Sequence, residues 1–126
     1  MTPGINIEEI AVDFLRLGIA GRTDEMYAKY VDMHGKHHNP WFPAGFPALQ
    51  QAMAGDFKRS PHKSIEVKHV VADGAFVAVH SHVVTSEGEP GFQTIHIFRF
   101  ERGKIVELWD CAAAIPKDSP NSDGTF

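Results

Sequence analysis

Two runs of alternating apolar and polar residues near the C-terminus predict a β-hairpin, and this segment constrains the fold more than any other. The runs flank Arg102-Gly103 within residues 92–111, FQTIHIFRFERGKIVELWDC. We expect a three-residue turn, Glu101 to Gly103, with Gly103 in the left-handed position, because glycine adopts that conformation without steric cost. The alternative is a two-residue turn at Arg102-Gly103, which requires a positive φ at the arginine.

The turn decides which side chains of the hairpin share a face. With three turn residues, His96 pairs with Leu108 and Thr94 pairs with Asp110, and side chains alternate with period two. One face of the hairpin then carries Thr94, His96, Phe98, Val106, Leu108 and Asp110. His96 and Asp110 become diagonal neighbours within reach of each other. A two-residue turn alone would place them on opposite faces.

Length and composition predict one domain over residues 1–126, long enough to bury about two thirds of its unfolded surface. The 12 basic and 16 acidic residues form no basic stripe, so we expect no nucleic-acid partner. No apolar run has the length of a membrane span, and no signal pattern opens the chain. The single cysteine, Cys111, suits a reducing compartment, so we expect a cytoplasmic protein with Cys111 as a small buried residue.

The first half of the chain has the apolar spacing of helices. One helix follows Asn6, an N-cap candidate, and its apolar positions recur at intervals of three and four: Ile7, Ile10, Ala11, Phe14 and Leu17. A second helix runs from Thr23 to about Val31, and a third begins near Pro47. Between these two helices we expect an irregular segment, residues 34–47.

After Pro61 the pattern changes to that of strands. Strands are predicted from Ile65 to Val71 and from Phe76 to Thr85, joined by a turn at Asp73-Gly74 and followed by the C-terminal hairpin. Helices first and an antiparallel meander afterwards indicate an α+β domain. Both faces of the predicted sheet are apolar and helices can cover only one, so we expect a homodimer.

This organisation resembles the nuclear-transport-factor-2-like (NTF2-like) superfamily, in which helices pack on a curved antiparallel sheet to form a cone. Two motifs resemble its SnoaL-like group, which is related to polyketide cyclases: His38-Asn39-Pro40, and IFRFERGKIVELWD at residues 97–110. The resemblance covers nearly the whole chain. It implies a mostly apolar pocket between helices and sheet, and general acid–base chemistry on a small organic substrate without a metal or other cofactor.

The resemblance also identifies the site residues that match and those that depart. His38 and Asp110 occupy positions that the group uses. The group commonly has aspartate where this chain has His96, and histidine where it has Leu108. We therefore expect His96 to distinguish this chain's chemistry or ligand from those of its relatives.

Each catalytic candidate has a structural alternative. Asp110 is placed for proton transfer, or it caps a loop or pairs with a base. His96 on an apolar strand is more often a core residue, but its place on the Asp110 face favours a pocket role, where Asp110 could orient it. We expect His38 to line the pocket and His37 to lie in a solvated loop.

The remaining candidates concern substrate binding. His80 and His82 share a strand face, but two ligands do not make a metal site. We expect one of them, His80, to line the pocket instead, although the sequence leaves open which face of the sheet the two histidines occupy. Trp41 and Phe42 either form the wall for an apolar ligand or pack in the core. The residues expected to contact substrate are Trp41, Phe42, His80, Phe98 and Leu108.

Three functional hypotheses follow. The first is a cyclase, isomerase or lyase that uses Asp110 as base or acid on a small carbonyl compound, with His96 and His38 as proton carriers or hydrogen-bond donors. The second is a pocket that binds a small apolar ligand without catalysis, because fold alone does not decide function. The third, a protein-interaction domain, predicts a filled cavity and an exposed apolar patch.

Overall fold

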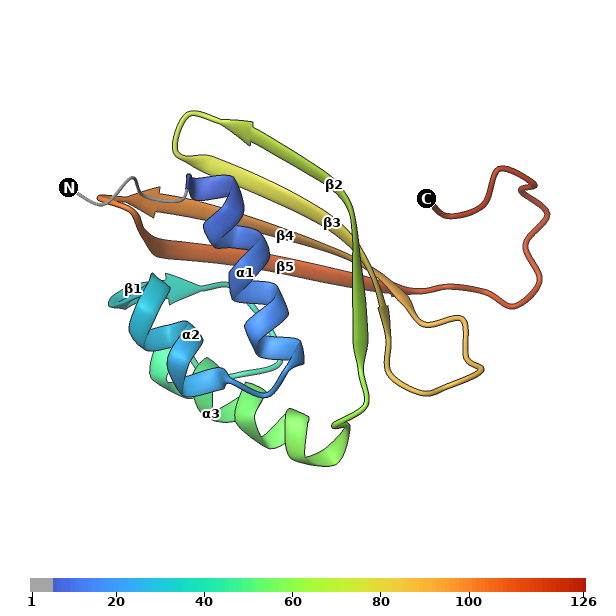
Figure 1. The fold of residues 1–126 in the computed structure, drawn as a ribbon, viewed down its shortest axis with the longest axis horizontal. Coiled ribbons are helices and arrows are strands. Elements are labelled where there is room, and N and C mark those ends of the chain that lie inside the picture. The colour runs from blue at the N-terminus through green and yellow to red at the C-terminus, as the bar shows by residue number, and fades with distance from the viewer. Residues whose placement is uncertain (1–5) are drawn as a thin grey trace.

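The structure, a computed structural model, describes residues 6–126. Within that range three helices pack against one face of a five-stranded sheet (Figure 1). In chain order the elements are α1 (Ile7–Ile19), α2 (Thr23–Tyr30), β1 (Val31–His37), α3 (Phe46–Arg59), β2 (Ser64–Asp73), β3 (Phe76–Val84), β4 (Phe92–Glu101) and β5 (Lys104–Ala114). The sheet order is β1-β5-β4-β3-β2, with β1 parallel to β5 and the other pairs antiparallel.

The helices form where the apolar spacing predicts them. The side chain of Asn6 accepts a hydrogen bond from the backbone N–H of Glu9 at 2.9 Å, which confirms Asn6 as the N-cap of α1. In α3 a proline occupies the first turn, where the missing N–H costs nothing. The predicted second helix ends one residue earlier than expected, at Tyr30.

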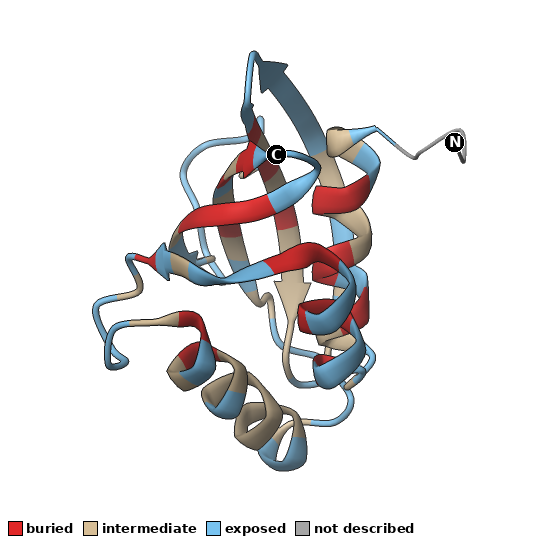
Figure 2. Cartoon of the chain, turned by 90° about the vertical axis from the view of Figure 1, so that its left-hand side faces the viewer, coloured by how far each residue is buried: buried red, intermediate tan, exposed pale blue. Residues whose placement is uncertain are grey.

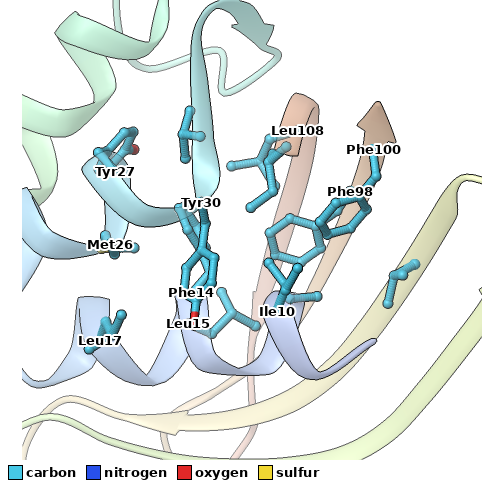
Figure 3. Close-up of a cluster of buried hydrophobic side chains, with 14 of the residues drawn as sticks. Ile10, Phe14, Leu15, Leu17, Met26, Tyr27, Tyr30, Phe98, Phe100 and Leu108 are labelled. Atoms are coloured by element: carbon cyan, nitrogen blue, oxygen red, sulfur yellow. The ribbon is translucent and has the colours of Figure 1, made fainter. Parts of the chain in front are cut away.

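The core fills the space between the helices and the inner face of the sheet (Figure 2). The ring of Phe14 on α1 meets two others edge-on: Tyr27 on α2, at a centroid distance of 5.7 Å, and Phe98 on β4, at 5.6 Å. Figure 3 shows Phe14 and Ile10 projecting from α1 toward Phe98 and Phe100. These contacts fix α1 across the sheet and so define one wall of the site.

Strand β1 is the element in which the structure differs most from the sequence prediction. Residues 31–37 form an edge strand, although the sequence predicts a helix end followed by an irregular segment. Their sequence, VDMHGKH, alternates apolar and polar residues only from Val31 to His34, which is too short a run to predict a strand, so pairing with β5 determines their conformation. Gly35 permits this pairing, because a Cβ there would lie 2.3 Å from the carbonyl oxygen of Val106.

The turn of the C-terminal hairpin also differs from the prediction. Arg102 and Gly103 both have positive φ, 53° and 75°, and Glu101 pairs with Lys104. The turn therefore has two residues, and the prediction of three is wrong. A turn with two left-handed residues matches the twist of the flanking strands, which makes even an arginine acceptable there.

A bulge next to this turn restores the predicted face. Phe100 pairs with Ile105 while Arg99 pairs with Glu107, so Val106 is an extra residue on β5. One inserted residue reverses which side chains of β5 face inward. Beyond the bulge, the inward-facing residues of both strands are therefore the same as those predicted with a three-residue turn. His96 and Asp110 consequently share a face, and they are direct partners in the ladder instead of diagonal neighbours.

Candidate active site

A cavity of about 270 Å³ lies between α1, α3 and the inner face of the sheet. Its wall is mostly apolar and includes Phe14, Leu15, Phe42, Met53, Phe57 and Val83. Two polar groups interrupt this wall. The first, which we call the carboxylate cluster, consists of Asn39, Thr94, His96 and Asp110; the second is the pair Asp56 and Lys63.

His96 and Asp110 face the cavity from neighbouring strands. Residue 96 is partly exposed, but its Nδ1 atom is buried and has no hydrogen-bond partner among residues 6–126. Burial lowers the pKa of His96, and the negative charge of Asp110 acts in the opposite direction. The imidazole is therefore neutral at pH 7. With Nδ1 buried, Nε2 is the nitrogen left to meet a ligand.

Asn39 fixes the Asp110 carboxylate. Its Nδ2 donates a hydrogen bond to Oδ2 of Asp110 at 3.0 Å, and its Oδ1 accepts one from the backbone N–H of Trp41, also at 3.0 Å. The two contacts orient the amide without ambiguity, because a carboxylate can only accept. This residue lies inside the His38-Asn39-Pro40 motif, in which only His38 is predicted to line the pocket.

His38 lies on the outer face of the sheet, away from the cavity. Its Nε2 donates to Oε2 of Glu107 at 2.6 Å, and its ring stacks on Trp109 at a centroid distance of 5.0 Å. The hydrogen bond from His38, with a smaller contribution from that of Arg99, lowers the pKa of Glu107. The structure therefore does not bring His38 together with Asp110 and His96, contrary to the expectation that it lines the pocket.

Of the five residues expected to contact substrate, two line the cavity and three do not. Phe42 and Leu108 line the cavity. Phe98 is fully buried in the core behind it, and Trp41 is 85% exposed. His80 lies on the outer face of β3, because the inner positions of that strand are the alternate residues, which include the buried Val79 and Ser81.

The partners of His80 show why it is absent from the cavity wall. Its Nε2 lies 2.9 Å from Oε1 of Gln93, and its Nδ1 lies 3.0 Å from Nδ1 of His69, all on the outer face.

The predictions that His37 is solvated and that Cys111 is buried are both wrong. His37 is buried, with Nε2 donating to the carbonyl oxygen of Pro43 at 2.8 Å, and Cys111 is exposed.

The pKa of His96 can be followed by its NMR signals and is expected to lie below the ordinary value of 6.5. Asp110→Asn should lower it further, because the negative charge that favours the imidazolium is removed. Asp118→Asn, in the exposed tail, is the control and should leave it unchanged. A pKa at or above 6.5 in the wild-type protein would contradict this description of the site.

The lowered pKa of His96 also makes the stability of the folded chain depend on pH. The unfolded chain binds a proton at this histidine more readily than the folded chain does, because the folded pKa is the lower one. The contribution of His96 is therefore fully present above pH 6.5, and it is lost as the pH falls through the folded pKa. Denaturant unfolding at a series of pH values measures this loss, which His96→Gln should remove.

Helices packed on a curved mixed sheet, with a cavity between the two layers, form an α+β domain with the NTF2-like fold. The SnoaL-like domain model matches residues 12–108, and the chain belongs to this family. No curated protein matches the chain. No helix among residues 6–126 is long and apolar enough to cross a membrane.

Several solved structures share the fold at low sequence identity. An uncharacterised cystatin-fold protein from Novosphingobium aromaticivorans aligns with a TM-score of 0.72 at 20% identity, over 86% of this chain and 99% of that one. A SnoaL-like polyketide cyclase from Agrobacterium tumefaciens aligns with a TM-score of 0.70 at 19% identity, over 87% and 93%. An NTF2-like protein from Cytophaga hutchinsonii aligns with a TM-score of 0.67 at 13% identity, over 90% and 95%. At these identities the likeness concerns the fold alone.

Proposed function

We propose that this protein is an acid–base enzyme that removes a proton next to a carbonyl group of a small, partly apolar compound. One observation carries the proposal: a carboxylate and a neutral imidazole, Asp110 and His96, are ladder partners in the wall of a mostly apolar cavity. Polyketide cyclase is the activity named for one of the similar structures, and cyclisation of that kind is consistent with this chemistry.

The proposed step uses each group of the carboxylate cluster in one role. The Asp110 carboxylate takes the proton as the C–H bond breaks, and the electron pair moves into the carbonyl group to form an enolate. His96, with its proton on Nε2, donates a hydrogen bond to the enolate oxygen. Asn39 holds the carboxylate through Oδ2 and leaves Oδ1 for the substrate proton. Aldol-type cyclisation, isomerisation and dehydration can all begin with this step.

Deuterium incorporation tests the proposal without knowledge of the natural substrate. Small ketones and esters with an apolar body are incubated with the protein in D₂O, and exchange at the carbon next to the carbonyl is followed by mass spectrometry. We expect at least one compound to exchange faster than in buffer alone. Compounds that bind without faster exchange would instead support the second candidate, a pocket that binds a small apolar ligand, which the mostly apolar wall favours.

We also propose that the outer face of the sheet joins two copies of this chain. The centre of that face is apolar and partly exposed, and its residues include Phe76, Ile95 and Ile97 at 44%, 37% and 37% exposure. The same patch on a second copy matches it in area and chemistry, as in a two-fold symmetric interface.

Sedimentation equilibrium is therefore expected to give twice the chain mass of 13.9 kDa. Ile97→Glu should give the monomer mass, because two carboxylates would be buried at the interface. Ser86→Glu, in the exposed turn after β3, is the control and should remain dimeric. A wild-type protein that is monomeric at micromolar concentration would contradict the proposal.

A further inference from the structure

Lys63 is the cationic residue of the cavity wall, and it lies apart from the carboxylate cluster. It directly precedes β2, and it forms an ion pair with Asp56 near the end of α3. Its side chain is only 18% exposed, whereas that of Asp56 is 46% exposed. A buried ammonium is costly, and this burial lowers the pKa of Lys63. Additional negative charge in the cavity would therefore be favourable at this position.

The charges around Lys63 leave capacity for an anion. The Asp56 carboxylate also lies 3.9 Å from the guanidinium of Arg59, so one negative group serves two positive ones. An ammonium carries three N–H donors, and the contact with Asp56 engages one of them. A carboxylate entering the cavity could bind a second donor without displacing Asp56.

The two polar groups lie at opposite sides of the sheet. Asp110 is on β5 and Lys63 adjoins β2, and the strand order places β4 and β3 between them. Three strand spacings amount to about 14 Å along the sheet. The wall between includes apolar residues such as Ile65 and Val83. A ligand that contacts both groups must be elongated, with an apolar body and polar ends.

We propose that Lys63 binds the carboxylate of such a ligand, so that the substrate class is an acid with a carbonyl group at its other end. The carbonyl end rests on the proposed function, because it is the end that Asp110 and His96 would act on. The carboxylate end rests only on the charges around Lys63. The two parts can therefore be tested separately.

A pair of probes isolates the contribution of charge. The compounds 2-naphthoate and 2-acetylnaphthalene have the same ring and nearly the same shape, but only the first is an anion. We expect isothermal titration calorimetry at pH 7 and low salt to show at least about tenfold tighter binding of 2-naphthoate, the usual effect of a hydrogen bond to a charged group. Equal affinity for the two probes would overturn the proposal.

Variants assign the preference to Lys63. Lys63→Met should remove it while changing the affinity for 2-acetylnaphthalene less than about threefold, and Lys63→Arg should retain most of it. Arg22→Met removes one positive charge from the exposed ion pair with Glu25, outside the cavity wall, and is the matched control. If Lys63→Met weakened both probes equally, Lys63 would serve only to hold α3 against β2.

Asp56→Asn provides an independent arm with the opposite sign. It leaves the charge of Lys63 without its partner, so 2-naphthoate should bind several-fold more tightly while 2-acetylnaphthalene is unchanged. An unchanged or weaker 2-naphthoate affinity in this variant would count against the proposal. A preference for 2-naphthoate without any deuterium incorporation would retain the anion site and reject the enzymatic proposal.

Discussion

Asp110→Asn is expected to slow deuterium incorporation by about 10²- to 10⁴-fold, the usual contribution of a general base. Asparagine has nearly the same shape as aspartate, but it cannot take up the substrate proton. Its amide oxygen can still accept the hydrogen bond from Nδ2 of Asn39, so the loop after β1 should keep its place. The rate is measured by mass spectrometry on any compound that the wild-type protein exchanges, and circular dichroism checks the fold.

Asn39→Ala separates catalysis from the structural alternative for Asp110. If the carboxylate serves only to cap the loop at Asn39, Asn39→Ala should lower the melting temperature, and neither variant should abolish exchange. If Asp110 is the base, Asn39→Ala should reduce the rate less than Asp110→Asn, because the carboxylate remains and loses only its orientation. Unchanged exchange in Asp110→Asn would reject the role of Asp110 as base.

The shared face of His96 and Asp110 could be predicted from the sequence, although the predicted turn is wrong. The alternation on each strand identifies the apolar set, and burial of that set determines the register. The turn and the bulge at Val106 each shift the alternation by one residue, and their effects cancel. Local sequence does not distinguish this combination from a single longer turn, because both satisfy the same pattern of burial.

The placement of His38 could not be predicted, because it depends on a contact between distant segments. The parallel pairing of β1 with β5 brings His37 opposite Leu108 and carries the chain past the edge of the sheet. The backbone N–H of His38 donates to the carbonyl oxygen of Leu108 at 2.9 Å, and its ring lies on the outer face while Asn39 enters the cavity. The alternation in residues 31–37 stops at His34, before the motif, so it does not indicate which side of the sheet each residue of the motif occupies.

Phe98 and Trp41 are both predicted to contact substrate, but the structure buries Phe98 in the core and exposes Trp41 to solvent. Both are large aromatic residues, and for Trp41 the sequence also allows core packing. Phe98 continues the inner alternation of β4 past His96 and reaches the layer of Phe14 on α1, which closes the cavity on that side. Trp41 follows Pro40 in a loop whose polar contacts hold the backbone and leave the indole in solvent.

Phe98→Ala is therefore expected to lower the free energy of unfolding by about 3–5 kcal/mol, the usual cost of removing a buried phenylalanine. The lost contacts include the edge-on pair with Phe14 at 5.6 Å, and the surrounding strands can close the resulting space only in part. Urea denaturation measures the change, which is a large share of the roughly 5–15 kcal/mol that is the typical free energy of unfolding of a domain.

Trp41→Ala is the matched control, since it removes an aromatic side chain of similar apolar area from a position that is 85% exposed. Its effect should remain within about 0.5 kcal/mol. Because Trp41 does not line the cavity, a ligand of the cavity should protect the wild-type protein and the Trp41 variant against urea to the same extent. A loss below about 1 kcal/mol in Phe98→Ala, together with weaker ligand protection in Trp41→Ala, would mean that the two residues had been assigned to the wrong roles.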